Sequence, residues 1–220
     1  MIDVVVLAAP RREAHKLCFR SLRKSDIGNR MNISMHPEGV AKNDHWRATH
    51  ELAAKASSEL VLVVEDDILV NSHILENAET WRWPLDRNFG AGWLYNPGGY
   101  STRDVWYQGP WEWAMTQAVL YRTEDLPELI EFAWKRMAGG MPWDCAMAWA
   151  AHQHGRKIRV HYPSLAEHLN DFPSAVGNGK GSVLRTSRGT FDAGWRRPTG
   201  HDHHRIDRFG REFTLEPRCR

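Results

Sequence analysis

A continuous apolar run that ends on three consecutive acids constrains this chain more than any other feature. Residues 61–70 read Val-Leu-Val-Val-Glu-Asp-Asp-Ile-Leu-Val. An apolar run without alternation predicts a strand that is buried on both faces of a sheet. Because an unpaired carboxylate is costly to bury, the acids Glu65, Asp66 and Asp67 predict either a compensating cation or an ordinary polar turn. We favour the cation, since hard divalent metals take oxygen ligands.

Strand and helix patterns alternate through the first part of the chain. Apolar segments rich in β-branched residues predict strands at 3–8, 31–36 and 59–65. Periodic segments predict helices at 12–24 and 43–57, the second capped by Asn43 or Asp44. This alternation predicts an α/β fold with a mostly parallel central sheet flanked by helices. In such sheets ligands bind beyond the carboxyl ends of the strands, where the three acids lie.

The rest of the chain continues this pattern around one long loop. We expect further elements at residues 73–81 (helix), 116–122 (strand), 125–137 (helix), 143 to about 155 (helix) and 157–162 (strand). Residues 96–113 are rich in Gly, Pro and aromatic side chains, which is typical of a substrate loop. Beyond about residue 177 the chain is Gly-rich, Arg-rich and aperiodic. We therefore predict a catalytic domain, 1–177, and a C-terminal extension, 178–220, that packs on the site or closes over it.

The composition is that of a soluble globular protein. The chain has 220 residues, of which 42% are hydrophobic and 25% charged, and no apolar run approaches the roughly 18 residues that span a bilayer. The N-terminal segment lacks a basic leader and predicts a first strand. Few and widely spaced cysteines favour a reducing cytoplasm, the host's if a phage encodes the chain, with Cys18 and Cys145 as small apolar helix residues. We expect a monomer or weak oligomer with no membrane partner.

The basic charge of the tail and the aromatic residues of the long loop are compatible with a polyanionic partner. Residues 180–220 carry ten basic and five acidic side chains, a net charge of +5, against −3 for the rest. Such a tail can attract nucleic acid, although many basic tails are simply solvated. In the long loop, Trp106, Trp111 and Trp113 could stack on the bases or sugars of an acceptor. They could equally pack as core beneath the loop.

The order of these motifs resembles the GT-A class of nucleotide-sugar glycosyltransferases over roughly residues 1–170. Residues 4–12 look like the first strand and nucleoside-binding turn of that class. Residues 39–43 look like the segment that leads into its metal-binding strand. Glu65-Asp66-Asp67 matches its DXD-type metal motif in a looser form, because no strict Asp-X-Asp is present.

Two later segments complete the resemblance. Pro142-Trp143-Asp144 resembles the acidic helix start that supplies the general base in inverting members of the class, although no second acid stands beside Asp144. Residues 163–168, Pro-Ser-Leu-Ala-Glu-His, resemble the late strand and loop whose histidine completes the metal shell. The class therefore implies an α/β fold, a metal ion and a nucleotide-sugar donor for this chain.

The resemblance assigns roles to individual residues. It implies Mn²⁺ or Mg²⁺ held by Asp67 and His168, a UDP-sugar as the leading donor, and Asp144 as the base that takes a proton from the acceptor hydroxyl. Acceptor binding falls to the three loop tryptophans. The implied donor-binding residues are Ala8, Pro10, Arg11, Asn43, Glu65, Asp66, Lys180 and Arg185.

Each principal role competes with a purely structural interpretation. Glu65 could form a salt bridge, His168 could be an ordinary surface or core histidine, and Asp144 could be a common first-turn helix acid. At a helix start the macrodipole favours the ionised form of Asp144. The cluster at residues 201–204, His-Asp-His-His, could chelate a metal, yet no cysteine lies nearby and we assign it no role.

Three classes of function remain open, and we favour the first. It is a metal-dependent glycosyltransferase that moves a sugar to an acceptor hydroxyl. The second is a nucleotidyl- or phosphotransferase with the same acidic site, and the third is a non-catalytic nucleic-acid-binding module. For the first class the acceptor could be a hydroxymethyl pyrimidine in phage DNA, reached by base flipping, or a protein, a lipid-linked saccharide or a free glycan.

Overall fold

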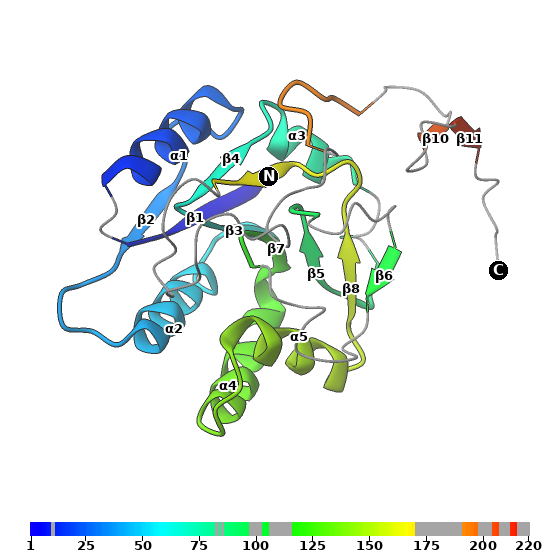
Figure 1. The fold of residues 1–220 in the computed structure, drawn as a ribbon. Helices are drawn as coiled ribbons and strands as arrows, with labels where there is room; N and C mark the ends of the chain where they lie inside the picture. Colours follow the sequence, from blue (N-terminus) through cyan, green and yellow to red (C-terminus); the bar gives the residue numbers. More distant parts are fainter. Residues whose placement is uncertain are drawn as a thin grey trace.

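A computed structural model of the chain describes residues 1–9, 12–81, 84, 86–96, 103–105, 116–169, 191–197, 204–206 and 212–214. In this described part, a seven-stranded sheet has the order β2-β1-β3-β7-β5-β8-β6 (Figure 1). Its strands are β1 (Ile2–Ala8), β2 (Asn32–Met35), β3 (Leu60–Glu65), β5 (Phe89–Trp93), β6 (Arg103–Val105), β7 (Ala118–Arg122) and β8 (Lys157–Val160). The helices are α1 (Arg12–Lys24), α2 (Lys42–Ala53), α3 (Ile74–Glu79), α4 (Leu126–Met137) and α5 (Trp143–Gln153).

The sheet is mixed but mostly parallel in direction. β1 pairs in parallel with β2 and β3, and β5 pairs in parallel with β8. β7 runs antiparallel between β3 and β5, and β6 runs antiparallel to β8. Five of the seven strands of this sheet therefore share one direction, which confirms the predicted fold class. Their carboxyl ends form a single edge, and the acids that follow β3 lie on it.

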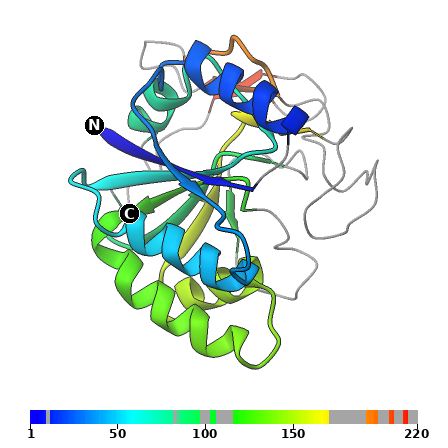
Figure 2. The ribbon, with the colours of Figure 1, turned by 90° about the vertical axis from the view of Figure 1, so that its left-hand side faces the viewer.

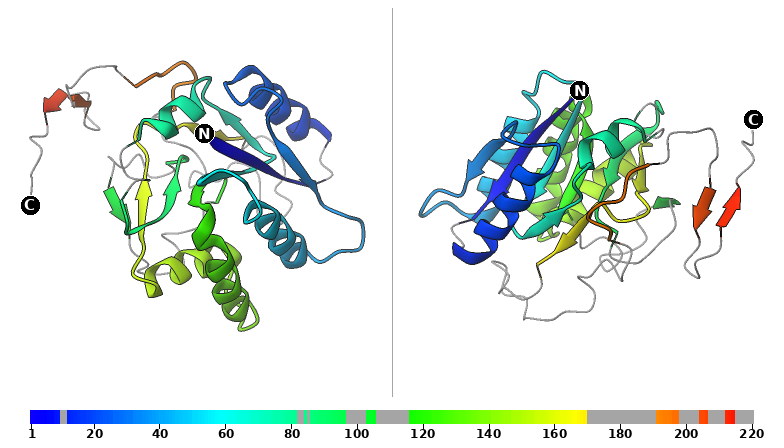
Figure 3. Two further views of the ribbon diagram at one scale, coloured as in Figure 1. Left: turned by 180° about the vertical axis from the view of Figure 1, so that it is seen from behind. Right: turned by 90° about the horizontal axis from the view of Figure 1, so that it is seen from above.

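Two layers of helices bury the two faces of this sheet. Successive residues of a strand point to opposite faces, so Leu62 and Val64 join one core cluster while Val61 and Val63 join the other. The first cluster includes side chains of α1 and α3, and the second those of α2, α4 and α5. Figure 2 shows the sheet between these layers, and Figure 3 shows the same arrangement from behind and from above.

A short ladder beside the main sheet was not predicted. β4 (Ile68–Val70) directly follows the acids and pairs antiparallel with β9 (Ala166–His168), so that Ile68 lies opposite His168. The long loop predicted at 96–113 likewise contains a strand, β6. Strands of three residues are too short to show a period-2 pattern, so the sequence does not reveal them.

β5 was missed for a different reason. Its sequence, Phe-Gly-Ala-Gly-Trp, contains two glycines, which usually mark turns. A Cβ at Gly92 would lie 2.5 Å from the ring of Trp81, which packs across this strand. Glycine is therefore needed here for the close approach of a tryptophan and not for a turn.

Several predicted element ends differ from the structure. α2 begins at Lys42 and ends at Ala53, four residues before the predicted end. Its N-cap is Ala41, without a side-chain hydrogen bond, so the predicted capping by Asn43 or Asp44 is wrong. β8 ends at Val160 because His161 to Pro163 leave the sheet.

The C-terminal part of the chain contains ordered pieces. Residues 191–197 pack against α3, and β10 (His204–Ile206) pairs with β11 (Glu212–Thr214), so two short strands form in a segment whose sequence shows no period. The predicted domain boundary at 177 falls outside the described residues. Among the described helices, none combines the length and hydropathy required to cross a bilayer.

Candidate active site

The three acids at the end of β3 point to different neighbours. Glu65 lies on the same face of β3 as Val61 and Val63, which is the face covered by α2, α4 and α5. Its Oε1 accepts a 2.8 Å hydrogen bond from the Thr116 hydroxyl. Asp66 lies on the other side, where its Oδ2 accepts a 2.6 Å hydrogen bond from the backbone N–H of Ala9. The same oxygen is 3.6 Å from Nε2 of His15 on α1. Asp66 therefore ties the end of β3 to the turn after β1.

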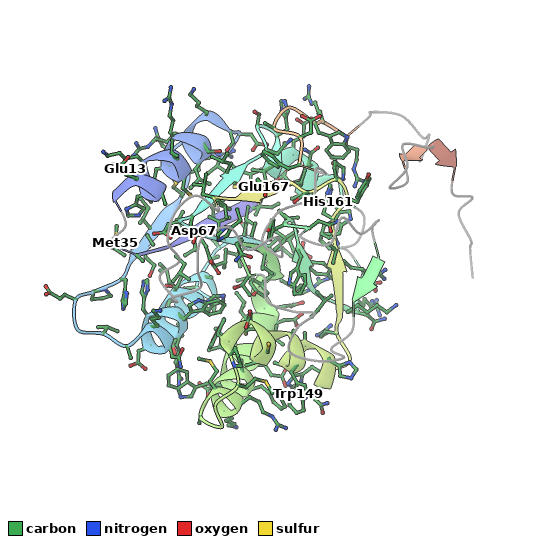
Figure 4. The ribbon with its side chains drawn as sticks, in the orientation of Figure 1. Glu13, Met35, Asp67, Trp149, His161 and Glu167 are labelled. Carbon is green, nitrogen blue, oxygen red and sulfur yellow. The ribbon has the colours of Figure 1, made fainter. Side chains whose placement is uncertain are left out.

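Asp67 faces His168 across the short ladder. Its Oδ2 lies 3.5 Å from Nε2 of His168, and the two side chains are only 5% and 3% exposed. The backbone carbonyl of Asp67 also accepts a 2.8 Å hydrogen bond from the N–H of Leu169. Figure 4 labels Asp67 near the centre of the molecule and Glu167 of β9. Pairing of β4 with β9 thus brings together two residues that are a hundred positions apart in sequence.

Burial of these acids produces a strongly negative environment. Burial and the charge of Asp67 raise the pKa of Glu65 to about 7, against the opposing hydrogen bond from Thr116. Beneath them, burial raises the pKa of the Cys18 thiol to about 12, and the charges of Asp66 and Asp67 act in the same direction. Cys18 is therefore no nucleophile, and the acids lie where a cation is favoured.

The spacing of Asp67 and His168 is compatible with two ligands of one divalent cation. Two atoms that each lie about 2.1 Å from one ion are about 3.0 to 3.5 Å apart at octahedral or tetrahedral angles. The 3.5 Å between Asp67 and His168 falls at the upper end of this range. Within the described ranges, no group of three His, Cys, Asp or Glu side chains could hold a metal without further ligands. Water and phosphate oxygens would complete the shell, as is common for Mg²⁺.

Asp144 lies in the first turn of α5 and faces a small cavity. The cavity, of about 10 Å³, lies between α5 and strands β5, β7 and β8 and has room for one water molecule. Thr116, the partner of Glu65, also lines this cavity. Burial raises the pKa of Asp144, although its Oδ1 accepts a hydrogen bond from the N–H of Cys145. Burial therefore acts against the helix dipole, which favours the ionised form of Asp144.

Two further predicted donor residues lie at the same sheet edge. Ala8 is buried at the end of β1, and its carbonyl accepts a 2.7 Å hydrogen bond from the N–H of His36. Asn43 is exposed in the first turn of α2, directly after the loop that follows β2. The remaining predicted site residues lie outside the described residues: Pro10, Arg11, Trp106, Trp111, Trp113, Lys180 and Arg185.

The structure adds two residues that the sequence interpretation missed. His15 approaches Asp66, and Thr116 binds Glu65. His15 stands one turn into the helix that follows the first strand, so its position at the carboxyl edge could have been inferred. Thr116 precedes an antiparallel strand, and only the sheet order brings it beside Glu65. Among the described residues, no basic side chain forms a salt bridge with Glu65, so the interpretation of Glu65 as a salt-bridge residue is not supported.

Comparison with known proteins supports the fold. No family model and no curated protein matches the sequence. The structure of TarS from S. aureus is similar, with a TM-score of 0.50 and 13% identity over 73% of this chain and 35% of that one. This chain therefore spans about a third of the length of that protein.

Two other solved structures give lower scores. TarS residues 1–349 in complex with UDP match with a TM-score of 0.49 and 12% identity, over 72% of this chain and 57% of that one. A glycosyltransferase involved in the glycosylation of the major capsid of PBCV-1 matches with 0.45 and 13% identity, over 73% and 82%. At these identities the comparison with the first TarS structure establishes the GT-A fold that the motifs resembled, and the activity has to be argued from the site.

Proposed function

We propose that this chain is a metal-dependent glycosyltransferase that moves a sugar from a nucleotide-sugar donor to an acceptor hydroxyl. The observation that carries the proposal is the buried pair of Asp67 and His168 at the carboxyl edge of the sheet. A carboxylate and an imidazole that are buried together on one short ladder form half of a cation site. A donor diphosphate supplies the oxygens that the described protein side chains do not.

Each acid has a separate part in this proposal. Asp67 and His168 hold the cation, which when bound neutralises the charge that develops on the diphosphate leaving group. Asp66 binds the N–H of Ala9 and so fixes the turn after β1, where we expect the nucleoside. Glu65 is held by Thr116 beside the metal ligands and is suited to bind the ribose or a metal-bound water.

Asp144 is the proposed general base. It shares the cavity of Thr116, so it lies on the same side of β3 as Glu65. Its raised pKa makes the carboxylate a stronger proton acceptor than an exposed aspartate, which suits removal of a proton from an attacking hydroxyl. This role corresponds to an inverting reaction, and near-normal turnover of an Asp144→Asn enzyme would argue for a retaining one.

A donor panel tests the proposal. The protein is titrated with UDP-, GDP- and CDP-sugars in the presence of Mn²⁺, and thermal shift and release of free nucleotide are measured. We expect metal-dependent stabilisation by one donor class. Asp67→Asn and His168→Gln should abolish this stabilisation, whereas Glu167→Gln, at the residue before His168 on β9 and opposite Leu69, should retain it. No stabilisation by any donor, with or without metal, would contradict the proposal.

Product analysis separates the alternatives. A nucleotidyltransferase releases pyrophosphate from a nucleoside triphosphate, whereas the proposed enzyme releases a nucleoside mono- or diphosphate. A nucleic-acid-binding module would bind with a steep salt dependence and would be unaffected by Asp67→Asn.

The acceptor is proposed only as a hydroxyl. Duplex DNA with hydroxymethyl pyrimidines follows from the charge of residues 180–220, most of which lie outside the described residues. Transfer to a glycan acceptor without transfer to such DNA would remove that option.

A further inference from the structure

The outer edge of the main sheet exposes apolar side chains on a strand whose backbone is paired on one side. β2 lies at the end of the sheet and is paired with β1 in the described part of the chain (Figure 1). Its Ile33 and Met35 are 45% and 47% exposed. Their partners in β1, Val6 and Ala8, belong to the core under α1, so both side chains project on that face of the sheet. An edge of this kind is a template for a further strand.

The backbone of β2 offers its free hydrogen-bonding groups at two particular residues. The N–H of His36 donates to the carbonyl of Ala8, so His36 faces β1. Because successive residues of a strand turn their N–H and C=O groups to alternate sides, Ser34 faces β1 as well. Ile33 and Met35 therefore direct their backbone groups to the outer edge.

The outer edge of β2 is complementary to the same edge of a second copy of the chain. In an antiparallel pair of two β2 strands related by a two-fold axis, Ile33 of one copy lies opposite Met35 of the other, and the reverse contact is identical. Because the backbone N–H and C=O groups of Ile33 and Met35 point to the outer edge, this register gives two hydrogen-bonded residue pairs, one on each side of the axis. Both side chains lie on the same face, so they contact across the axis. A shift by one residue would place Ser34 opposite Ile33 and lose these bonds.

Charge supports the same register. Arg30 and Glu38 flank β2 and are both exposed. When Ile33 pairs with Met35 of a second copy, Arg30 and Glu38 lie beyond the two ends of the paired strands, so the end that carries Arg30 faces the end of the other copy that carries Glu38. Pro37 has no N–H and limits the ladder to these few residues. We propose that this edge binds a second copy of the chain, giving a weak symmetric dimer with a sheet that continues through both subunits.

Sedimentation of the full-length protein over a range of concentrations tests the proposal. We expect the mass to rise from the 25.4 kDa monomer toward twice that value. Met35→Lys and Ile33→Lys should each raise the dissociation constant at least about tenfold, because each places a charge in the apolar contact twice. Leu17→Lys is the matched control. Leu17 is 41% exposed on α1, one turn before Ser21, whose hydroxyl binds β4, away from β2.

Cross-linking tests the register. With Cys219 replaced by Ser, an Ile33→Cys protein is mixed with a Met35→Cys protein and oxidised. The mixture should form covalent heterodimers, because opposed residues of a hydrogen-bonded pair are about 5.5 Å apart between Cα atoms, within disulfide range. Either protein alone should cross-link far less. A monomer mass at every concentration, or equal dimerisation of wild type and Met35→Lys, would overturn the proposal.

Discussion

The adjacent carboxylates of Asp66 and Asp67 have different partners in this site. Asp66 accepts a backbone hydrogen bond, whereas Asp67 lies beside His168 and repels Glu65. Burial and the charge of Asp67 raise the pKa of Glu65, so we expect this charge to lower the stability of the fold when no cation is bound. Asp67, the proposed metal ligand, is therefore expected to lower the stability of the metal-free protein, as binding residues often do.

Asp67→Asn should separate binding from stability. Removal of the negative charge relieves the repulsion with Glu65, so the variant should melt at a higher temperature than wild type in the presence of a chelator. It should gain nothing from Mn²⁺, whereas wild type gains stability as metal and donor bind. Differential scanning fluorimetry with chelator and with metal measures both effects. A variant that melts lower than wild type in chelator would show that Asp67 is mainly structural.

Asp144→Asn should lower turnover by on the order of a hundredfold while raising stability at neutral pH. Burial raises the pKa of Asp144, so the folded state binds its proton more tightly than the unfolded state. The stabilisation by the protonated form is present at low pH and is lost as pH rises through the folded pKa. The Tm difference from wild type should therefore be positive at pH 7 and vanish below about pH 4, the unfolded value.

Asp44→Asn provides the control for that variant. Asp44 is also a first-turn helix acid but is exposed on α2. Its replacement should leave turnover unchanged and lower stability slightly, because a favourable charge at a helix start is lost. Equal effects of the two substitutions on turnover would remove the general-base role from Asp144.

Among the elements, the segment 191–197 is held by several hydrogen bonds with residues 71–80, and Asn71 contributes two of them. Asn71, directly after β4, donates from Nδ2 to the carbonyls of Asp192 at 2.6 Å and Trp195 at 2.9 Å. Its Oδ1 accepts from the N–H of His73 at 2.7 Å. The same residue therefore closes the β4 and β9 ladder and holds the segment in which Trp195 packs on the core.

Asn71→Ala should reduce the free energy of unfolding by about 2 to 4 kcal/mol, because the buried Asn71 amide makes at least three hydrogen bonds that the substitution removes. Urea denaturation measures this change. Ser72→Ala is the control: Ser72 is exposed, and its backbone N–H, which donates to the carbonyl of Ala193, is kept by the substitution. A change below about 0.5 kcal/mol in Asn71→Ala, the range of ordinary surface substitutions, would show that the segment is held by other contacts.

The elements that could be predicted from sequence are those with enough residues to show a period. β1, β3, α1, α4 and α5 were found within two residues of their ends because each has a long apolar pattern. β4 and β9 have three residues each and were missed, so the pairing of Asp67 with His168 could be named only from the class that the motifs resemble. Their proximity depends on a pairing across a hundred residues, which no local pattern contains.

At the scale of the whole molecule, each helix layer buries a neutral histidine against the sheet. His50 of α2 stacks on Trp46, with ring centroids 4.2 Å apart, and donates from Nδ1 to the carbonyl of Trp46. His161 lies on the other face, in edge contact with Trp81 and Trp195. Figure 4 labels His161 near the end of β8. Burial lowers the pKa of His50 to about 4 and of His161 to about 3.

These two histidines should make the fold sensitive to acid. Below the unfolded value near 6.5, the unfolded chain binds a proton at each site and the folded chain does not, so stability falls as pH falls toward the folded values. Between pH 6.5 and 4.5 each site should cost about 2 to 3 kcal/mol, and because the sites lie on opposite faces the losses should add. Glu65 and Asp144 titrate in the opposite sense, so only a comparison of variants isolates the histidines.

His50→Gln and His161→Gln should each flatten the pH profile on the acid side. Urea denaturation at pH 7 and pH 4.5 gives the loss of unfolding free energy for wild type and for each variant. The loss should be smaller in each variant by about 2 to 3 kcal/mol, whatever the substitution costs at pH 7, because the missing group no longer takes up a proton on unfolding. His152→Gln, at an exposed position of α5, should keep the wild-type loss. A wild-type loss retained in both His50→Gln and His161→Gln would place the acid sensitivity in other groups.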